Sequence, residues 1–185
     1  MKLKKFNYKI VNSTNNSAIR IIKTSNVKSG MVIAEKQIKG RGQYGKTWTS
    51  YKGNLFVSIF FPIDKINLTL KDLTKINCLL VRKLISNFYK GKIYFKPPND
   101  LLIDKKKITG ILQETCLKSA ETFIIIGIGI NLIRSPKIKG YPTTNLFDLT
   151  NVKINSHKAA LRLKKIYERF IPHLLKFNVK NISRI

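Results

Sequence analysis

The run ETFIIIGIGINL, at residues 121–132, constrains the fold more than any other part of this sequence. Its centre is an unbroken series of isoleucine and glycine residues, too short to cross a membrane, which predicts a buried β-strand. Side chains alternate between the two faces of a strand, so Gly127 and Gly129 face the same side and leave a slot without side chains. Glycine weakens a strand, which favours a ligand or close packing at this slot. Asn131, at the end of the strand, can hydrogen-bond a base.

Strands also predominate elsewhere. β-branched and aromatic residues predict strands over 6–11, 31–37, 54–62 and 93–96, and a hairpin of 99–104 and 108–115 that turns at 105–107. Apolar spacing predicts helices over 15–25, 68–89 and 156–177, with Ser13 and Thr14 capping the first and Pro172 kinking or interrupting the last. We therefore predict an α+β fold with a mixed, largely antiparallel sheet flanked by helices.

The composition is that of one globular domain over residues 1–185. A hydrophobic content of 43% excludes a disordered chain. Cys78 and Cys116 lie in apolar surroundings without CxxC spacing, so we expect two reduced core residues. The basic N-terminus has no long apolar run, so it is not a signal peptide, and no apolar stretch reaches the length of a membrane span. We expect a cytoplasmic protein.

The net charge of +27 comes from 36 basic and 9 acidic residues. Such a charge favours a nucleic acid or an anionic membrane as partner. The alternative is compositional drift toward lysine, asparagine and isoleucine. The lysines are spread over the whole chain and outnumber the arginines, whereas a DNA-reading protein clusters arginine for bidentate base contacts. We expect no specific DNA binding and no membrane partner, and a basic nucleic-acid-binding protein stays open as an alternative.

The run GRGQYGKTWTS, at residues 40–50, combines three glycines, positive charge and the single tryptophan. It contains the GxGxxG spacing of dinucleotide-binding loops, but such a loop opens a helix, and here a strand follows. Two interpretations remain. One is a plain flexible loop. The other is a phosphate cradle, ordered only with ligand, in which backbone N–H groups and Arg41 bind anionic oxygens. Trp48 either covers an adenine or an apolar ligand, or belongs to the core.

A third unusual segment is KPPNDLLIDKKKITGILQET, at residues 96–115. Asn99 and Asp100 follow two prolines that fix the start of the hairpin. Asp100 could ligate Mg²⁺ or hold a lysine, and the alternative is that the two residues simply form a turn. Lys107 precedes Gly110 in a strand, a combination that lets a ligand approach a cation closely.

Taken in order, these segments resemble the catalytic domain of biotin–protein ligases, the family that attaches biotin to carboxylases. The resemblance begins with STN at 13–15 and continues through AEKQIKGRGQYGKTWTS, KPPNDLLIDKKKITGILQE, IGIGINL and TTNLFDLT. It implies an ATP-dependent ligase that forms biotinyl-5′-AMP and then transfers biotin to a lysine of a biotin carboxyl carrier domain. ATP and biotin would be substrates, with Mg²⁺ as cofactor. A lipoate-type ligase of the same superfamily is the nearest alternative, but its RRxSGGG loop is not found.

The resemblance also implies roles for individual residues. Lys107 and Arg41 would be catalytic and would contact the biotin carboxylate and the α-phosphate. The biotin pocket would be formed by Ser13, Thr14, Asn15, Gln37, Arg41, Gly42, Gln43, Lys107, Gly110, Leu112, Gly127 and Gly129. The nucleotide would be bound by Gly40, Gly45, Trp48, Asn99 and Asn131, with Asp100 as a possible metal contact.

The chain departs from the family pattern at several places. Pro97 stands where the family usually has tryptophan, which predicts an altered ATP side. Gln43 stands where the family often has arginine, which predicts weaker retention of the adenylate. The motifs begin at residue 13, which leaves no room for the N-terminal helix-turn-helix of longer members. We also expect the small C-terminal barrel of the family to be missing.

Overall fold

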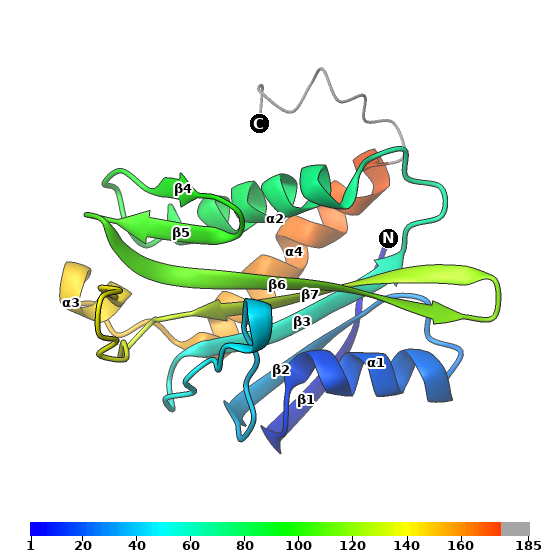
Figure 1. The fold of residues 1–185 in the computed structure, drawn as a ribbon, viewed down its shortest axis with the longest axis horizontal. Helices are drawn as coiled ribbons and strands as arrows, with labels where there is room; N and C mark the ends of the chain where they lie inside the picture. Colours follow the sequence, from blue (N-terminus) through cyan, green and yellow to red (C-terminus); the bar gives the residue numbers. More distant parts are fainter. Residues whose placement is uncertain (175–185) are drawn as a thin grey trace.

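The computed structural model of the protein describes residues 1–174, and their strands form a seven-stranded sheet in the order β1-β2-β3-β7-β6-β5-β4 (Figure 1). The strands are β1 (Lys4–Val11), β2 (Gly30–Gln37), β3 (Leu55–Pro62), β4 (Tyr94–Lys96), β5 (Asp100–Ile103), β6 (Lys106–Lys118) and β7 (Glu121–Ile130). β1 and β2 are parallel, because helix α1 (Thr14–Thr24) crosses between them, and the other neighbouring pairs are antiparallel. The predicted α+β fold with a mixed, largely antiparallel sheet is therefore confirmed.

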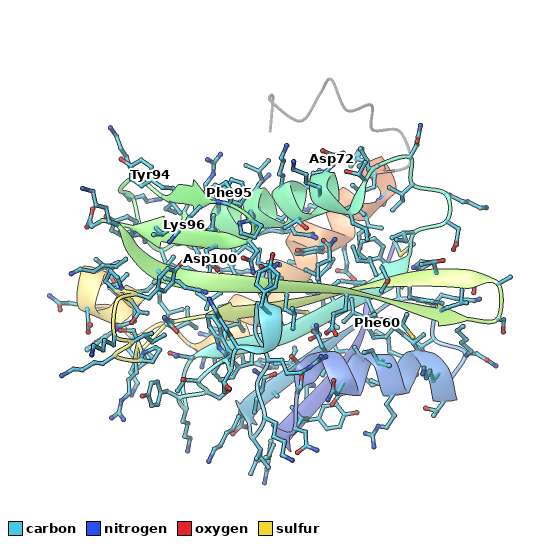
Figure 2. All side chains as sticks on the ribbon, viewed as in Figure 1. Phe60, Asp72, Tyr94, Phe95, Lys96 and Asp100 are labelled. Carbon is cyan, nitrogen blue, oxygen red and sulfur yellow. The ribbon has the colours of Figure 1, made fainter. Side chains whose placement is uncertain are left out.

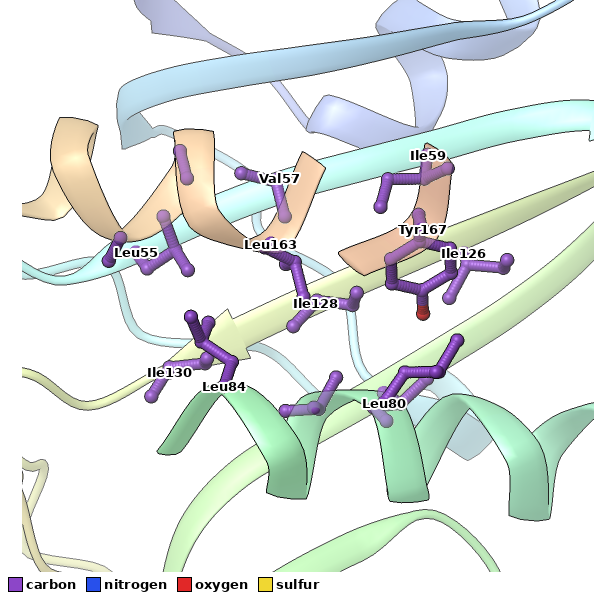
Figure 3. Close-up of a cluster of buried hydrophobic side chains, with 14 of the residues drawn as sticks. Leu55, Val57, Ile59, Leu80, Leu84, Ile126, Ile128, Ile130, Leu163 and Tyr167 are labelled. Atoms are coloured by element: carbon purple, nitrogen blue, oxygen red, sulfur yellow. The ribbon is translucent and has the colours of Figure 1, made fainter. Parts of the chain in front are cut away.

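Helices α2 (Leu70–Ile85) and α4 (Ser156–Leu174) cover one face of this sheet (Figure 1). Alternate residues of the two central strands point toward them and form the main core, in which Val57 of β3 lies opposite Ile128 of β7 (Figure 3). Leu80, Leu163 and Tyr167 pack onto this layer from the helices. Within residues 1–174, no helix is long and apolar enough to pass through a membrane.

Helix α1 covers the opposite face and encloses a smaller apolar cluster. Ala18 and Ile22 of the helix pack there with Phe60 and Ile125 of the sheet. Cys116 belongs to this cluster and Cys78 to the main core, and both thiols are free, as predicted. The sheet is thus covered on both faces, and the end of the α1 face beyond the helix N-terminus is left for a ligand.

The structure corrects several local expectations. The β5–β6 hairpin turns at Asp104 and Lys105, both in the left-handed region, so Lys107 lies inside a strand and not in the predicted turn. Two residues suffice because such a turn matches the twist of the flanking strands. Ser13 occupies the N-cap position of α1 but makes no side-chain capping hydrogen bond. Helix α4 continues through Pro172 to Leu174, and the predicted end at 177 lies outside the described residues. A short helix, α3 (Leu146–Thr150), was not predicted.

Candidate active site

A cavity of about 510 Å³ lies on the α1 face of the sheet, at the N-terminus of that helix. Its floor is formed by residues of β6 and β7 and its walls by residues 13–15, 41–44, 46–49 and 96–100 and by five residues between 136 and 143. Figure 2 shows Lys96 and Asp100, which flank the turn between β4 and β5. The cavity therefore gathers segments that lie far apart in the sequence, including all three unusual runs.

The start of α1 supplies buried polar groups to one end of the cavity. The backbone N–H of Thr14 donates to Gln37 Oε1 at 2.9 Å, and the Thr14 hydroxyl donates to the same oxygen at 3.1 Å. Ser13 is 3% exposed and lines the cavity beside them. These contacts hold the Gln37 side chain in place at the end of β2 and give this wall a polar character.

Asn15 and Arg41 meet at the carboxylate of Glu114. Asn15 Nδ2 and Arg41 Nη2 each donate to Glu114 Oε2 at 2.6 Å. Asn15 Nδ2 also donates to the Leu112 carbonyl at 3.2 Å, and Asn15 Oδ1 accepts from the buried Ser58 hydroxyl at 2.5 Å. The Asn15 amide is thus committed to protein partners and shapes the wall, while Arg41 is paired with a protein carboxylate at the edge of the cavity.

The glycines of β6 and β7 are explained by close packing. A Cβ atom at Gly127 would lie 2.4 Å from Asn15 Oδ1, and one at Gly129 would lie 2.3 Å from Trp48 Cε2. A Cβ atom at Gly110 would lie 2.8 Å from Trp48 Cζ3. Gly127 and Gly129 face the same side as predicted, but the slot is not empty, because Asn15 and Trp48 occupy it. Any larger residue would displace them.

The glycine-rich run forms a small hairpin. Arg41 and Thr47 form an antiparallel bridge, the N–H of Gly42 donates to the Lys46 carbonyl at 2.6 Å, and the N–H of Trp48 donates to the Gly40 carbonyl at 2.9 Å. These bonds place the Trp48 ring over the floor of the cavity. Residues 40–47 also match the P-loop spacing GxxxxGKT, but a P-loop opens a helix, and here strand β3 follows.

Lys107 is fixed at the floor of the cavity by an ion pair. Its Nζ lies 2.8 Å from Asp100 Oδ1, and the Tyr141 hydroxyl donates to Asp100 Oδ2 at 2.7 Å. Lys107 Nζ also lies 5.4 Å from the centre of the Trp48 ring. Burial and the hydrogen bond to Asp100 raise the pKa of Tyr141 well above its ordinary value.

Burial, aided by the Asp100 charge, raises the pKa of the Cys78 thiol to about 12, so this cysteine stays protonated at neutral pH.

Two of the residues predicted to bind a nucleotide, Asn99 and Asn131, line the cavity. Asn99 Nδ2 donates to the Ile111 carbonyl at 2.5 Å, and Asn131 Nδ2 donates to the Thr144 carbonyl at 3.1 Å. Among the described residues, Asn131 Oδ1 and Trp48 Nε1 are buried without a hydrogen-bond partner. Leaving such groups unpaired costs about 1–3 kcal/mol each, so a polar ligand that pairs with them would be stabilised.

The structure brings nearly all predicted site residues together. The two exceptions are Gly40, which is buried under the Trp48 carbonyl, and Gly45, which lies at the exposed tip of the hairpin. The remaining predicted residues line the cavity, together with others that were not predicted, among them Tyr44, Lys46, Lys96, Ile138, Lys139 and Tyr141.

The donor set does not fit a metal held by the protein. Both oxygens of Asp100 are engaged, one by Lys107 and the other by Tyr141. Within the described part of the chain, no group of three His, Cys, Asp or Glu residues could hold a metal ion. These contacts favour the other prediction for Asp100, that it holds a lysine.

Two residues that shape the site escaped prediction. Glu114 could have been found, because it is one of only nine acids and alternates with Gly110 and Leu112 on the same face of a predicted strand. Tyr141 had no such signal. It lies in an irregular segment after β7, and only the tertiary fold brings it to Asp100.

The chain belongs to the Biotin/lipoate A/B protein ligase family, whose sequence model matches residues 8–131. Within this family, the chain is 32% identical over 126 residues to the bifunctional ligase/repressor BirA of Escherichia coli, covering 66% of this chain and 39% of that protein. It is 26% identical over 144 residues to the biotin–[acetyl-CoA-carboxylase] ligase of Mycobacterium tuberculosis, covering 75% of this chain and 52% of that protein. The chain thus spans about half or less of the length of these relatives.

A solved structure shares the fold. The biotin protein ligase from Aquifex aeolicus, in complex with biotin and ATP, superposes with a TM-score of 0.80 at 24% sequence identity, covering 94% of this chain and 72% of that one. The cavity floor therefore belongs to a sheet of the same architecture as that of an enzyme that binds both compounds.

Proposed function

We propose that the chain is an ATP-dependent biotin–protein ligase. It forms biotinyl-5′-AMP and pyrophosphate from biotin and ATP, then transfers biotin to a lysine of a biotin carboxyl carrier domain in the cytoplasm. Family membership and the names of the relatives support this assignment. The observation that carries it is the cavity itself, which holds Lys107, Arg41 and the start of α1 around one volume large enough for a small ligand.

The first step brings two anions together. The biotin carboxylate attacks the α-phosphorus of ATP, and the bond from that phosphorus to the oxygen bridging the β-phosphate breaks, so pyrophosphate leaves. Lys107 and Arg41 offset the repulsion and stabilise the charge on the α-phosphate, and the cavity walls hold the reactants in line. Arg41 must exchange Glu114 for the substrate to do so.

The second step needs no protein nucleophile. The amine of the acceptor lysine attacks the acyl carbon of the mixed anhydride, the amine loses a proton, and AMP leaves. The site is consistent with this, because Cys78 is buried in the core and burial, with the Asp100 charge, raises the pKa of its thiol. The name of the Mycobacterium tuberculosis relative supports a carboxylase carrier domain as acceptor.

The cavity divides naturally between the two substrates. The biotin head would lie at the polar wall of Ser13, Thr14 and Gln37, and the adenylate near Asn131. Gln43, in place of the family's arginine, would hold the adenylate less tightly. Mg²⁺ would arrive with the phosphates of ATP, since Asp100 does not fit as its ligand.

The test is incubation of the chain with labelled biotin, ATP, Mg²⁺ and a biotin carboxyl carrier domain. We expect pyrophosphate release that depends on biotin, and label on the carrier lysine. Parallel reactions with lipoate and octanoate examine the substrate. If either acid supports release and biotin does not, the assignment within the family is wrong.

A further inference from the structure

We propose that Tyr141 is a positioning residue of this site, whose hydroxyl orients the Asp100 carboxylate so that Asp100 in turn holds the Lys107 ammonium group. The reaction that this residue would serve rests on the proposed function. The contacts of Tyr141 with Asp100 and Lys107 do not depend on it. Tyr141 lies between the segments that carry the family resemblance, in the irregular chain between β7 and α3.

The Asp100 carboxylate is confined at both oxygens. It is only 8% exposed, Oδ1 is buried without a hydrogen bond and forms an ion pair with Lys107 Nζ at 2.8 Å, and Oδ2 accepts the Tyr141 hydroxyl at 2.7 Å. Rotation of the carboxylate would break both contacts together. Removing the hydroxyl leaves one buried oxygen without its donor, so the carboxylate is free to turn and Lys107 loses its fixed partner.

The backbone around Tyr141 is attached to Lys107 as well. The Lys107 N–H donates to the Pro142 carbonyl at 2.9 Å, and the Thr144 N–H donates to the Lys107 carbonyl at 2.9 Å. Asn131 holds the same segment through the Thr144 carbonyl. Lys107 is thus held at its backbone by residues 142–144 and at its side chain through Tyr141, which gives the tyrosine a fixed place from which to act.

The hydroxyl acts as a donor at neutral pH. An ionised Asp100 can only accept, and burial together with Asp100 raises the pKa of Tyr141, so the phenol keeps its proton. The ring itself has another contact, because Lys96 Nζ lies 4.2 Å from its centre. Tyr141→Phe keeps this ring and removes only the donor, which makes it a clean test.

The kinetic test compares Tyr141→Phe with Tyr94→Phe, a matched control on β4 that is 54% exposed. Misplacing Lys107 should lower kcat for biotin-dependent ATP–pyrophosphate exchange by about tenfold or more, because a small displacement of a catalytic group is costly. The KM for biotin should rise by less than kcat falls, because Lys107 is one of several predicted contacts of biotin and the polar wall at Thr14 and Gln37 is untouched. A raised KM with unchanged kcat would overturn the proposal.

The single tryptophan supplies a readout that does not depend on activity. Lys107 Nζ lies 5.4 Å from the Trp48 ring, so its displacement should alter the emission of Trp48. We expect Tyr141→Phe to shift the emission toward that of Lys107→Ala, and Tyr94→Phe to leave it unchanged. Unchanged emission in Tyr141→Phe would show that Lys107 does not depend on the hydroxyl.

A second background tests the route through Asp100. In Asp100→Asn, adding Tyr141→Phe should cause no further loss of kcat, because the carboxylate that the hydroxyl orients is already gone. If Tyr141→Phe lowers kcat equally with and without Asp100→Asn, Tyr141 does not act through Asp100 and the proposal is overturned. If the unmodified chain activates no biotin, the proposed function fails, yet the emission of the variants still decides whether Tyr141 positions Lys107.

Discussion

Replacing Lys107 with alanine removes a cation that we propose contacts the biotin carboxylate and the α-phosphate. Stabilisation of transition-state charge by one such group is worth about 10²–10³-fold in kcat, so we expect biotin-dependent pyrophosphate release to fall by that factor. The fold should persist, because Asp100 keeps its hydrogen bond from Tyr141. The matched control is Lys106→Ala, an exposed neighbour on the same strand. Equal turnover in Lys107→Ala and the unmodified chain would exclude Lys107 from the chemistry.

At the level of single residues, the sequence predicted which residues lie at the site better than it predicted what each of them contacts. The glycines at 127 and 129 signalled close approach, and the alternation rule placed them on one side of the strand correctly. What approaches them, Asn15 and Trp48, comes from segments more than 75 residues away along the chain, which no local pattern encodes. Asn15, assigned by resemblance to the biotin pocket, lines the cavity, and its amide is also bonded to Ser58 and Glu114, contacts that the sequence did not predict.

At the scale of elements, the hairpin of residues 40–47 is attached to β6 chiefly through Arg41 and Glu114. Glu114→Gln replaces an ion pair with a neutral hydrogen bond of roughly half the strength, so the hairpin should open more often. We expect faster amide hydrogen exchange in this segment. Glu121→Gln, at an exposed ion pair with Lys28, serves as control and should leave it unchanged. Equal protection in the two variants would mean that Glu114 does not hold the hairpin.

A buried polar chain joins the helical layer to the sheet. The Tyr167 hydroxyl of α4 donates to Asn77 Oδ1 at 3.0 Å, and Asn77 Nδ2 of α2 donates to Gln113 Oε1 at 2.9 Å. Tyr167→Phe leaves the buried Asn77 oxygen without this donor, which should lower the free energy of unfolding by about 1–3 kcal/mol. Urea denaturation measures this, with Tyr8→Phe on edge strand β1 as reference. The KM for biotin should stay the same. A large rise would imply that this row of hydrogen bonds affects the cavity.

The elements themselves were largely predictable, whereas of their pairings only the β5–β6 hairpin was predicted. Alternation and β-branched runs located the strands within a few residues, since a half-buried strand must alternate. The turn at 104–105 was missed because a run of three lysines reads as a loop, whereas the backbone needs only two residues there. β1 and β2 are parallel because of the path of α1, and the sequences of the two strands do not encode this direction of pairing.

For the molecule as a whole, most of the charge of +27 lies outside the cavity, which five of the 36 basic residues line. Lysines spread along the whole chain should give weak, sequence-independent attraction to DNA that falls steeply with salt. We expect fluorescence anisotropy to show similar binding of two unrelated duplexes at low salt and little binding of either near physiological salt. A strong preference for one duplex that survives at higher salt would revive a dedicated nucleic-acid function.

The contact between the Leu3 N–H and Glu168 Oε1, at 2.8 Å, joins the residue just before β1 to helix α4 across 165 residues. The wall of the cavity also depends on a contact between residues far apart in the sequence, because Asn15 donates to Glu114 across 99 residues. During synthesis at about 5–20 residues per second, Leu3 therefore waits on the order of ten to thirty seconds for its partner to be made. Before that, β1 can pair with β2 and α1 can pack against β2 and β3, but helix α4 is still missing. The lysines on the edge strand β1 then hinder its pairing with other nascent chains.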